Sequence, residues 1–162
     1  MRAIDRALVD DVWRDVTGYA PARVASEAQA FLELQPHAAA LSQSVTRGFD
    51  PTVQKAALGL GFLLFKVLES SLGRPFPQLA EDRILEAYAL TQVWLAEHDG
   101  AAPAQLLEAL EHGEHPSLPG YILSVFYEGA AAADYDDTVR ASLFCLLKTL
   151  TDALDLAHVE EE

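Results

Sequence analysis

The segment from Asp50 to Gly73 constrains the fold of this chain more than any other. Asp50-Pro51 marks a helix start, because the aspartate can accept from free backbone amides and proline at the first helical position loses no hydrogen bond. The residues from 51 to 72 are apolar nearly all round a helix, and Gly73 ends it. A helix that is apolar on every face lies in an interior. The segment therefore predicts a helical bundle packed around a central helix.

The rest of the chain also shows helical spacing. Ile4, Leu8, Val12 and Val16 lie four residues apart and place one apolar stripe on a helix over 3–17. Further helices are predicted over 22–34, 37–46, 78–98, 103–112, 117–128 and 137–158. No segment alternates as a strand does, and 162 residues is the size of one domain. We therefore predict a single all-α domain over 1–162, a bundle of about eight helices.

The two halves of the chain repeat a residue order with a period near 81. Tryptophan, glycine and proline follow one another at Trp13, Gly18 and Pro21, and again at Trp94, Gly100 and Pro103. An internal duplication would give two tandem pseudo-symmetric four-helix halves, 1–80 and 81–162, with the helices at 51–72 and 137–158 as central partners. The alternative is chance, because the chain is rich in leucine and alanine.

Charge and composition exclude several classes of protein. The net charge of −14 arises entirely in residues 75–162 and argues against non-specific nucleic-acid binding. This acidic excess is either a solvated surface or a face for a basic partner. The longest apolar run, 56–65, is half of the about 20 residues that a membrane helix needs. The single cysteine, Cys145, excludes a disulfide framework and is expected to be an inert core residue. With no leader pattern at the N-terminus, we expect a cytoplasmic protein with no membrane span.

Two lysines stand out because each is the lone cation of a strongly apolar helix. Lys66 and Lys148 would have perturbed pKa values or buried ion pairs if they were buried, and otherwise their side chains reach the surface. Glu69 and Asp152 are ion-pair partners within reach on the same helices. A ligand pocket between the two halves would be lined by the two lysines and three aromatic residues: Trp13, Tyr88 and Trp94.

Three other patterns have both a functional and a structural interpretation. His112 and His115 could bind zinc or nickel, although Gly113 breaks the helix between them and an exposed turn is the alternative. Aromatic residues near a predicted loop could anchor an interface: Tyr121, Phe126 and Tyr127. The glycines of Gly59-x-Gly61 lack the preceding strand of a dinucleotide site and instead predict close approach of another helix.

The sequence contains no nucleophile elbow, phosphate loop or zinc-protease motif, so it gives no positive argument for an enzyme and none for a cofactor. We expect a small acidic helical protein that acts as a protein–protein interaction or regulatory module. Its partner would be another protein or a second copy in a homodimer. The alternative is a helical protein with a ligand pocket or a cryptic active site between its two halves.

Overall fold

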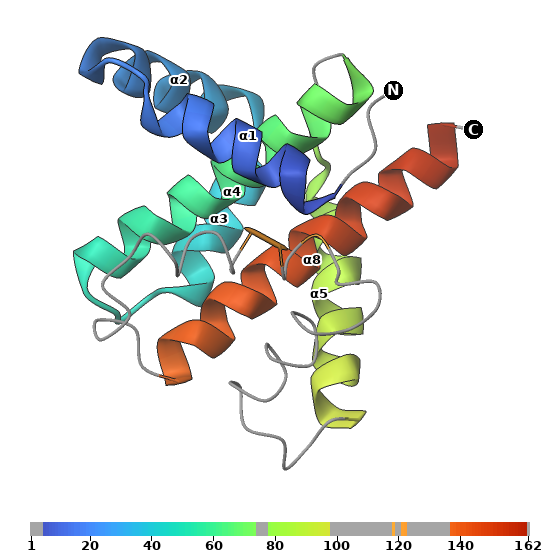
Figure 1. Ribbon diagram of the computed structural model, residues 1–162. Helices are drawn as coiled ribbons and strands as arrows, with labels where there is room; N and C mark the ends of the chain where they lie inside the picture. Colours follow the sequence, from blue (N-terminus) through green and yellow to red (C-terminus); the bar gives the residue numbers. More distant parts are fainter. Residues whose placement is uncertain (1–4, 74–77, 98–117, 119–120, 123–136, 162) are drawn as a thin grey trace.

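The computed structural model describes residues 5–73, 78–97, 118, 121–122 and 137–161, and within these residues every regular element is a helix (Figure 1). The elements are α1 (Arg6–Thr17), α2 (Pro21–Leu34), α3 (Pro36–Val45), α4 (Pro51–Leu72), α5 (Glu81–Glu97) and α8 (Asp137–Glu161). The predicted all-α class is confirmed. The short helices expected over 103–112 and 117–128 fall outside the described residues, apart from Leu118, Tyr121 and Ile122.

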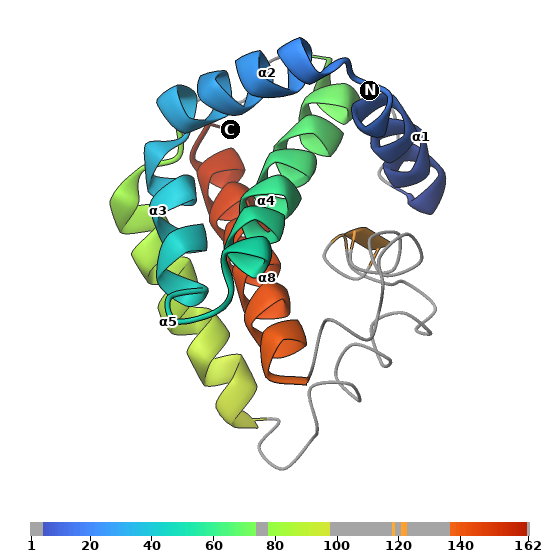
Figure 2. The same ribbon diagram turned by 90° about the vertical axis from the view of Figure 1, so that its left-hand side faces the viewer.

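Helices α4 and α8 pack against each other in the centre of the bundle, as their apolar sequences predict. Figure 2 shows them side by side, with α3 and α5 on one flank, α1 on the other and α2 crossing above. Leucines from both helices are almost completely buried and form much of the core: Leu60, Leu63, Leu64, Leu143, Leu146, Leu147 and Leu150. Among the described helices, none combines the length and apolar character that crossing a membrane requires.

Short polar residues fix the helix ends. The Asp50 carboxylate accepts a hydrogen bond of 2.8 Å from the backbone amide of Thr52, which confirms the predicted start of α4. This bond lowers the pKa of the Asp50 carboxyl. Gly73 ends α4 in a left-handed conformation with φ of 72°, which a residue with a side chain rarely adopts, and its amide donates to the Glu69 carbonyl. Asp5 caps α1 through the amide of Leu8.

Helix α2 is less embedded than its sequence indicates. Val24, Ala28, Phe31 and Leu32 share the face that the sequence places inward. Only Phe31 is buried, whereas Val24 is 50% and Leu32 39% exposed. The main helix contact of α2 is with α3. The apolar face of α2 therefore borders an open space instead of closing on α4.

The connection between α2 and α3 is more deeply buried than α2 itself. Gln35 is 3% exposed, and its Oε1 accepts a hydrogen bond of 2.9 Å from the backbone amide of Leu79, just before α5. This bond joins the α2–α3 corner to the start of α5. It satisfies a buried amide that would otherwise lack a partner.

Candidate functional site

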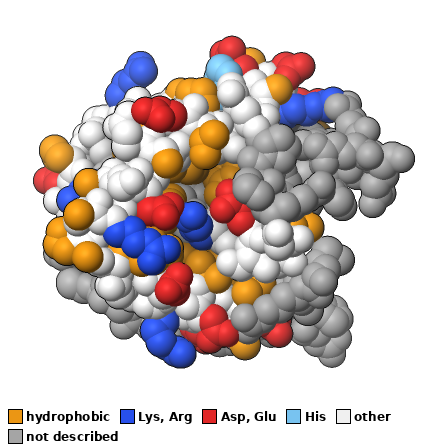
Figure 3. All heavy atoms as spheres, turned by 90° about the horizontal axis from the view of Figure 1, so that it is seen from above, with side chains coloured by type: hydrophobic (Ala, Val, Ile, Leu, Met, Phe, Trp, Pro, Cys, Tyr) orange, Lys and Arg blue, Asp and Glu red, His pale blue; other side chains and the backbone are white. Residues whose placement is uncertain are grey.

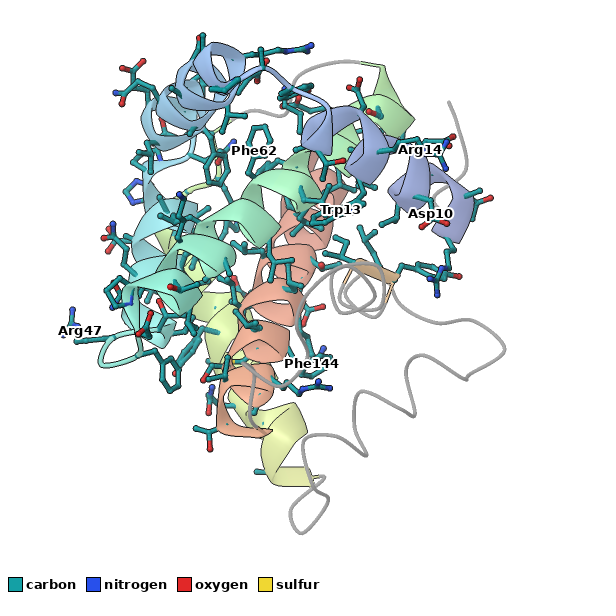
Figure 4. All side chains as sticks on the ribbon, turned by 60° about the vertical axis from the view of Figure 1, so that its left-hand side comes forward. Asp10, Trp13, Arg14, Arg47, Phe62 and Phe144 are labelled. Atoms are coloured by element: carbon teal, nitrogen blue, oxygen red, sulfur yellow. The ribbon has the colours of Figure 1, made fainter. Side chains whose placement is uncertain are left out.

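An apolar groove of about 500 Å³ lies between α1, α2 and α4. Trp13 of α1 and Phe62 of α4 lie in the space between these helices (Figure 4). Val24 and Leu32 form the α2 wall, and Leu58 contributes from α4. In Figure 3 hydrophobic side chains show in a hollow bordered by charged ones. The exposed apolar face of α2 is thus one wall of a cavity.

Two local features of the sequence contribute to the open groove. Residues 18–20 separate α1 from α2, and Pro21 begins α2 with a fixed φ, so that α2 leaves α1 at an angle (Figure 2). On α4, Gly59 lies in the groove wall, and a Cβ added there would meet nothing within 4 Å. The missing side chain at Gly59 therefore adds to the space between the helices.

Gly61 allows other helices to approach α4 closely, which was predicted for both Gly59 and Gly61. A Cβ at this position would lie 3.7 Å from each of Leu150, Phe31 and Ser42, which belong to three other helices. The predicted close approach is confirmed at Gly61. At Gly59 it is wrong, because that glycine faces the groove.

An aromatic cluster connects α2 to α4 beside the groove. The ring of Phe31 stands edge-on to that of Phe62 with centroids 5.9 Å apart, and lies 5.6 Å from that of Phe65. Edge-on rings attract each other because the positive edge of one meets the negative face of the other. Phe31 is therefore the main apolar attachment of α2 to the central helix.

An ion-pair cluster ties α2 to α4 at the same place. The Lys66 ammonium lies 3.0 Å from the Glu27 carboxylate on α2 and 3.8 Å from Glu69 on its own helix. Burial alone would lower the pKa of Lys66, but the hydrogen bond that its ammonium donates to Glu27 and the charges of Glu27 and Glu69 outweigh burial and raise that pKa. Lys66 is thus held as a charged ammonium, which is a structural cation and a poor nucleophile.

A second cation, Arg23, also neutralises Glu27. Its guanidinium lies 3.8 Å from the Glu27 carboxylate and stacks 3.7 Å over the ring of Tyr19. A small hollow of about 50 Å³, lined by Glu27, Phe62, Lys66 and Glu69, adjoins the groove at this end. The two cations and the two carboxylates at this end of the groove therefore neutralise one another.

Lys55 differs from the other cations around the groove. It is an exposed residue of α4 and lines the groove. Within the described residues it has no ion-pair partner. Among the described residues that line the groove, Lys55 is therefore the cation without a neutralising carboxylate.

The structure places two of the five candidate ligand residues, Trp13 and Lys66, at the groove and its adjoining hollow. Trp13 lines the groove and Lys66 the adjoining hollow, whereas Tyr88 is partly exposed on α5 and belongs to neither. Lys148 lies 2.9 Å from Asp152, so both predicted intrahelical ion pairs are confirmed. The side chain of Trp94 lies outside the described residues. The groove is built from the first half of the chain, and a pocket between the two halves stays a prediction.

The other candidates contribute little to this site. Tyr121 packs half-buried against the core, while Phe126, Tyr127, His112 and His115 lie outside the described residues. No group of three metal-ligating side chains occurs in the described part of the chain. Burial raises the pKa of the Cys145 thiol, against hydrogen bonds from Thr149 and Gln92 that lower it. Cys145 is therefore a protonated core thiol, as predicted.

Sequence reasoning missed most of the groove. The spacing of Val24 and Leu32 places them on one apolar face of a helix, but nothing local shows whether such a face is covered. The available signal for Lys55 and Gly59 was their spacing of four on α4, which places them on one side of that helix.

Comparison of the chain with models of protein families, with curated proteins and with solved structures finds no match. The geometry of the groove is therefore the basis for assigning a function.

Proposed function

We propose that this protein binds an apolar small molecule in the groove between α1, α2 and α4. The observation that carries the proposal is the apolar groove itself, whose volume of about 500 Å³ lies within the roughly 300–1,000 Å³ of ligand pockets. An occupant would cover Val24 and Leu32, which are 50% and 39% exposed. Removing apolar surface from water is favourable by about 25 cal/mol per Å².

Fluorescence tests the proposal directly. The chain has two tryptophans, so Trp94→Phe leaves Trp13 in the groove wall as the single one. We expect the neutral apolar dye phenylnaphthylamine to bind this variant with energy transfer from Trp13. Absence of saturable dye binding would overturn the proposal.

A blocking substitution locates the dye. Gly59→Leu places a side chain into open space in the groove wall and should weaken dye binding by at least about tenfold. Ser70→Leu is the matched control, because it adds the same side chain to an exposed position of α4 outside the groove lining. Equal dye binding by Gly59→Leu and Ser70→Leu would contradict the location.

Self-association through α5 is a second candidate function, in line with the expected protein or homodimer partner. Three large apolar residues of α5 are strongly exposed: Leu85 at 61%, Leu90 at 52% and Val93 at 57%. We expect Leu85→Glu to convert a dimer into monomers in sedimentation velocity. Leu34→Glu on α2 is the control, because Leu34 is also 61% exposed. A wild-type chain that stays monomeric would discard this candidate.

We also retain the internal duplication as a proposal. Helix α1 packs on α4 and α5 packs on α8, and these are the pairs that the two repeats would make equivalent. The central packing of α4 on α8 is in line with a pseudo-twofold arrangement. If the α1–α4 pair cannot be superposed on the α5–α8 pair with the chain order kept, the duplication is wrong.

A further inference from the structure

We propose that the occupant of the groove is an aliphatic carboxylic acid whose single negative charge is neutralised by Lys55. The inference rests on the proposed function and names the class of ligand. It follows from the balance of charges around the groove and from the face of α4 on which Lys55 lies.

The charge balance favours an anion with one charge. Glu27, the carboxylate that lines the groove, is already neutralised by Lys66 at 3.0 Å and Arg23 at 3.8 Å. Lys55 has no ion-pair partner in the described residues. A monoanion would balance Lys55, whereas a dianion would leave one negative charge without a partner, and a cation would be repelled by Lys55.

The geometry of α4 predicts that the ligand is an extended chain. Lys55, Gly59 and Phe62 occupy positions i, i+4 and i+7, which lie on one face of a helix. The distance from Lys55 to Phe62 along the helix axis is about 10 Å. No side chain stands between them at Gly59, where a Cβ would meet nothing within 4 Å. A straight apolar chain can therefore run from the Lys55 ammonium across Gly59 to the Phe62 ring.

The far end of this path is suited to an apolar terminus. Phe62 packs edge-on against Phe31, and both line the groove. Beyond them, Lys66 is paired with Glu27 and Glu69. A second polar group on the ligand would find no free charge there, so one head group and one apolar body satisfy the groove.

Competition against phenylnaphthylamine tests the inference, using dodecanoate below its micelle-forming concentration and dodecanol as the uncharged counterpart. We expect Lys55→Gln to weaken dodecanoate binding by roughly fivefold to tenfold and to leave dodecanol binding unchanged. Arg47→Gln is the matched control, because Arg47 is an exposed cation outside the groove lining and far from Trp13 and Phe62 (Figure 4).

The outcomes separate the two proposals. Dye binding with equal dodecanoate affinity in wild type and Lys55→Gln would overturn the carboxylate inference and leave the apolar groove in place. The same loss in Arg47→Gln as in Lys55→Gln would overturn it too, because the effect would then be one of overall charge. No saturable dye binding to the wild type would overturn the proposed function itself.

Discussion

Two glycines of α4 that are separated by a single residue have different effects on helix packing. Gly59 and Gly61 are separated by about 200° around α4, so they face different surroundings. Gly61 admits Leu150, Phe31 and Ser42 to the helix surface, and Gly59 opens the groove. The sequence predicted close packing at both, because it identifies a small residue without showing what lies opposite.

The same substitution should therefore have opposite effects at the two positions. Gly59→Leu should raise the free energy of unfolding by about 0.5–1 kcal/mol, because it replaces a flexible helical glycine and meets no neighbour. Gly61→Leu should lower it by about 1–3 kcal/mol through overpacking against Leu150 and Phe31. Urea unfolding followed by circular dichroism measures both, and a change of the same sign would contradict this account.

The Lys66 ion pair predicts a defined dependence on pH. Its folded pKa is raised above the ordinary 10.5, so its contribution is fully present below that value and is lost as pH rises through the folded pKa. We expect Lys66→Met to lower the free energy of unfolding by about 0.5–1 kcal/mol at neutral pH. The deficit should disappear in alkaline solution, measured by urea unfolding across pH. A deficit that persisted there would point to lost packing on Phe62 instead of lost charge.

At the scale of the elements, helix ends were predictable and helix environments were not. Asp50-Pro51 and Gly73 fix the ends of α4 through local hydrogen bonds and a local backbone conformation, which adjacent residues determine. Whether α2 would be covered depends on how residues 18–20 direct it, and this depends on contacts with distant residues. For the same reason the Lys66–Glu69 pair was predictable on one helix, whereas the shorter contact of Lys66 with Glu27 was not.

The α4 cap also gives a pH-dependent prediction. Asp50→Ala should lower the melting temperature, because the Thr52 amide loses its acceptor, and Asp50→Ser should restore most of the loss. The folded pKa of Asp50 is lowered from 3.8, so the capping contribution is present above that value and is lost as pH falls through the folded pKa. Calorimetry should show wild type and Asp50→Ala converging in acid. A constant difference would mean that the charge of Asp50 is irrelevant.

At the scale of the whole molecule, the groove and the acidic excess belong to different parts of the chain. The groove is formed by residues between 13 and 63, within a stretch of balanced charge, whereas the excess of −14 comes from residues 75–162. The sequence alone shows this difference in charge between the two parts of the chain. The cavity could be found only from the arrangement of three helices.

The shallow attachment of α2 has a consequence for amide hydrogen exchange. Phe31 is its one buried residue in the described structure, so α2 can detach at a lower free energy than α4 and α8, whose leucines form the core. We expect α2 amides to exchange through a sub-global opening, with protection well below that of α4, in hydrogen–deuterium mass spectrometry. An occupant of the groove should slow α2 selectively. Equal protection of α2 and α4 would show that the bundle opens as a single cooperative unit.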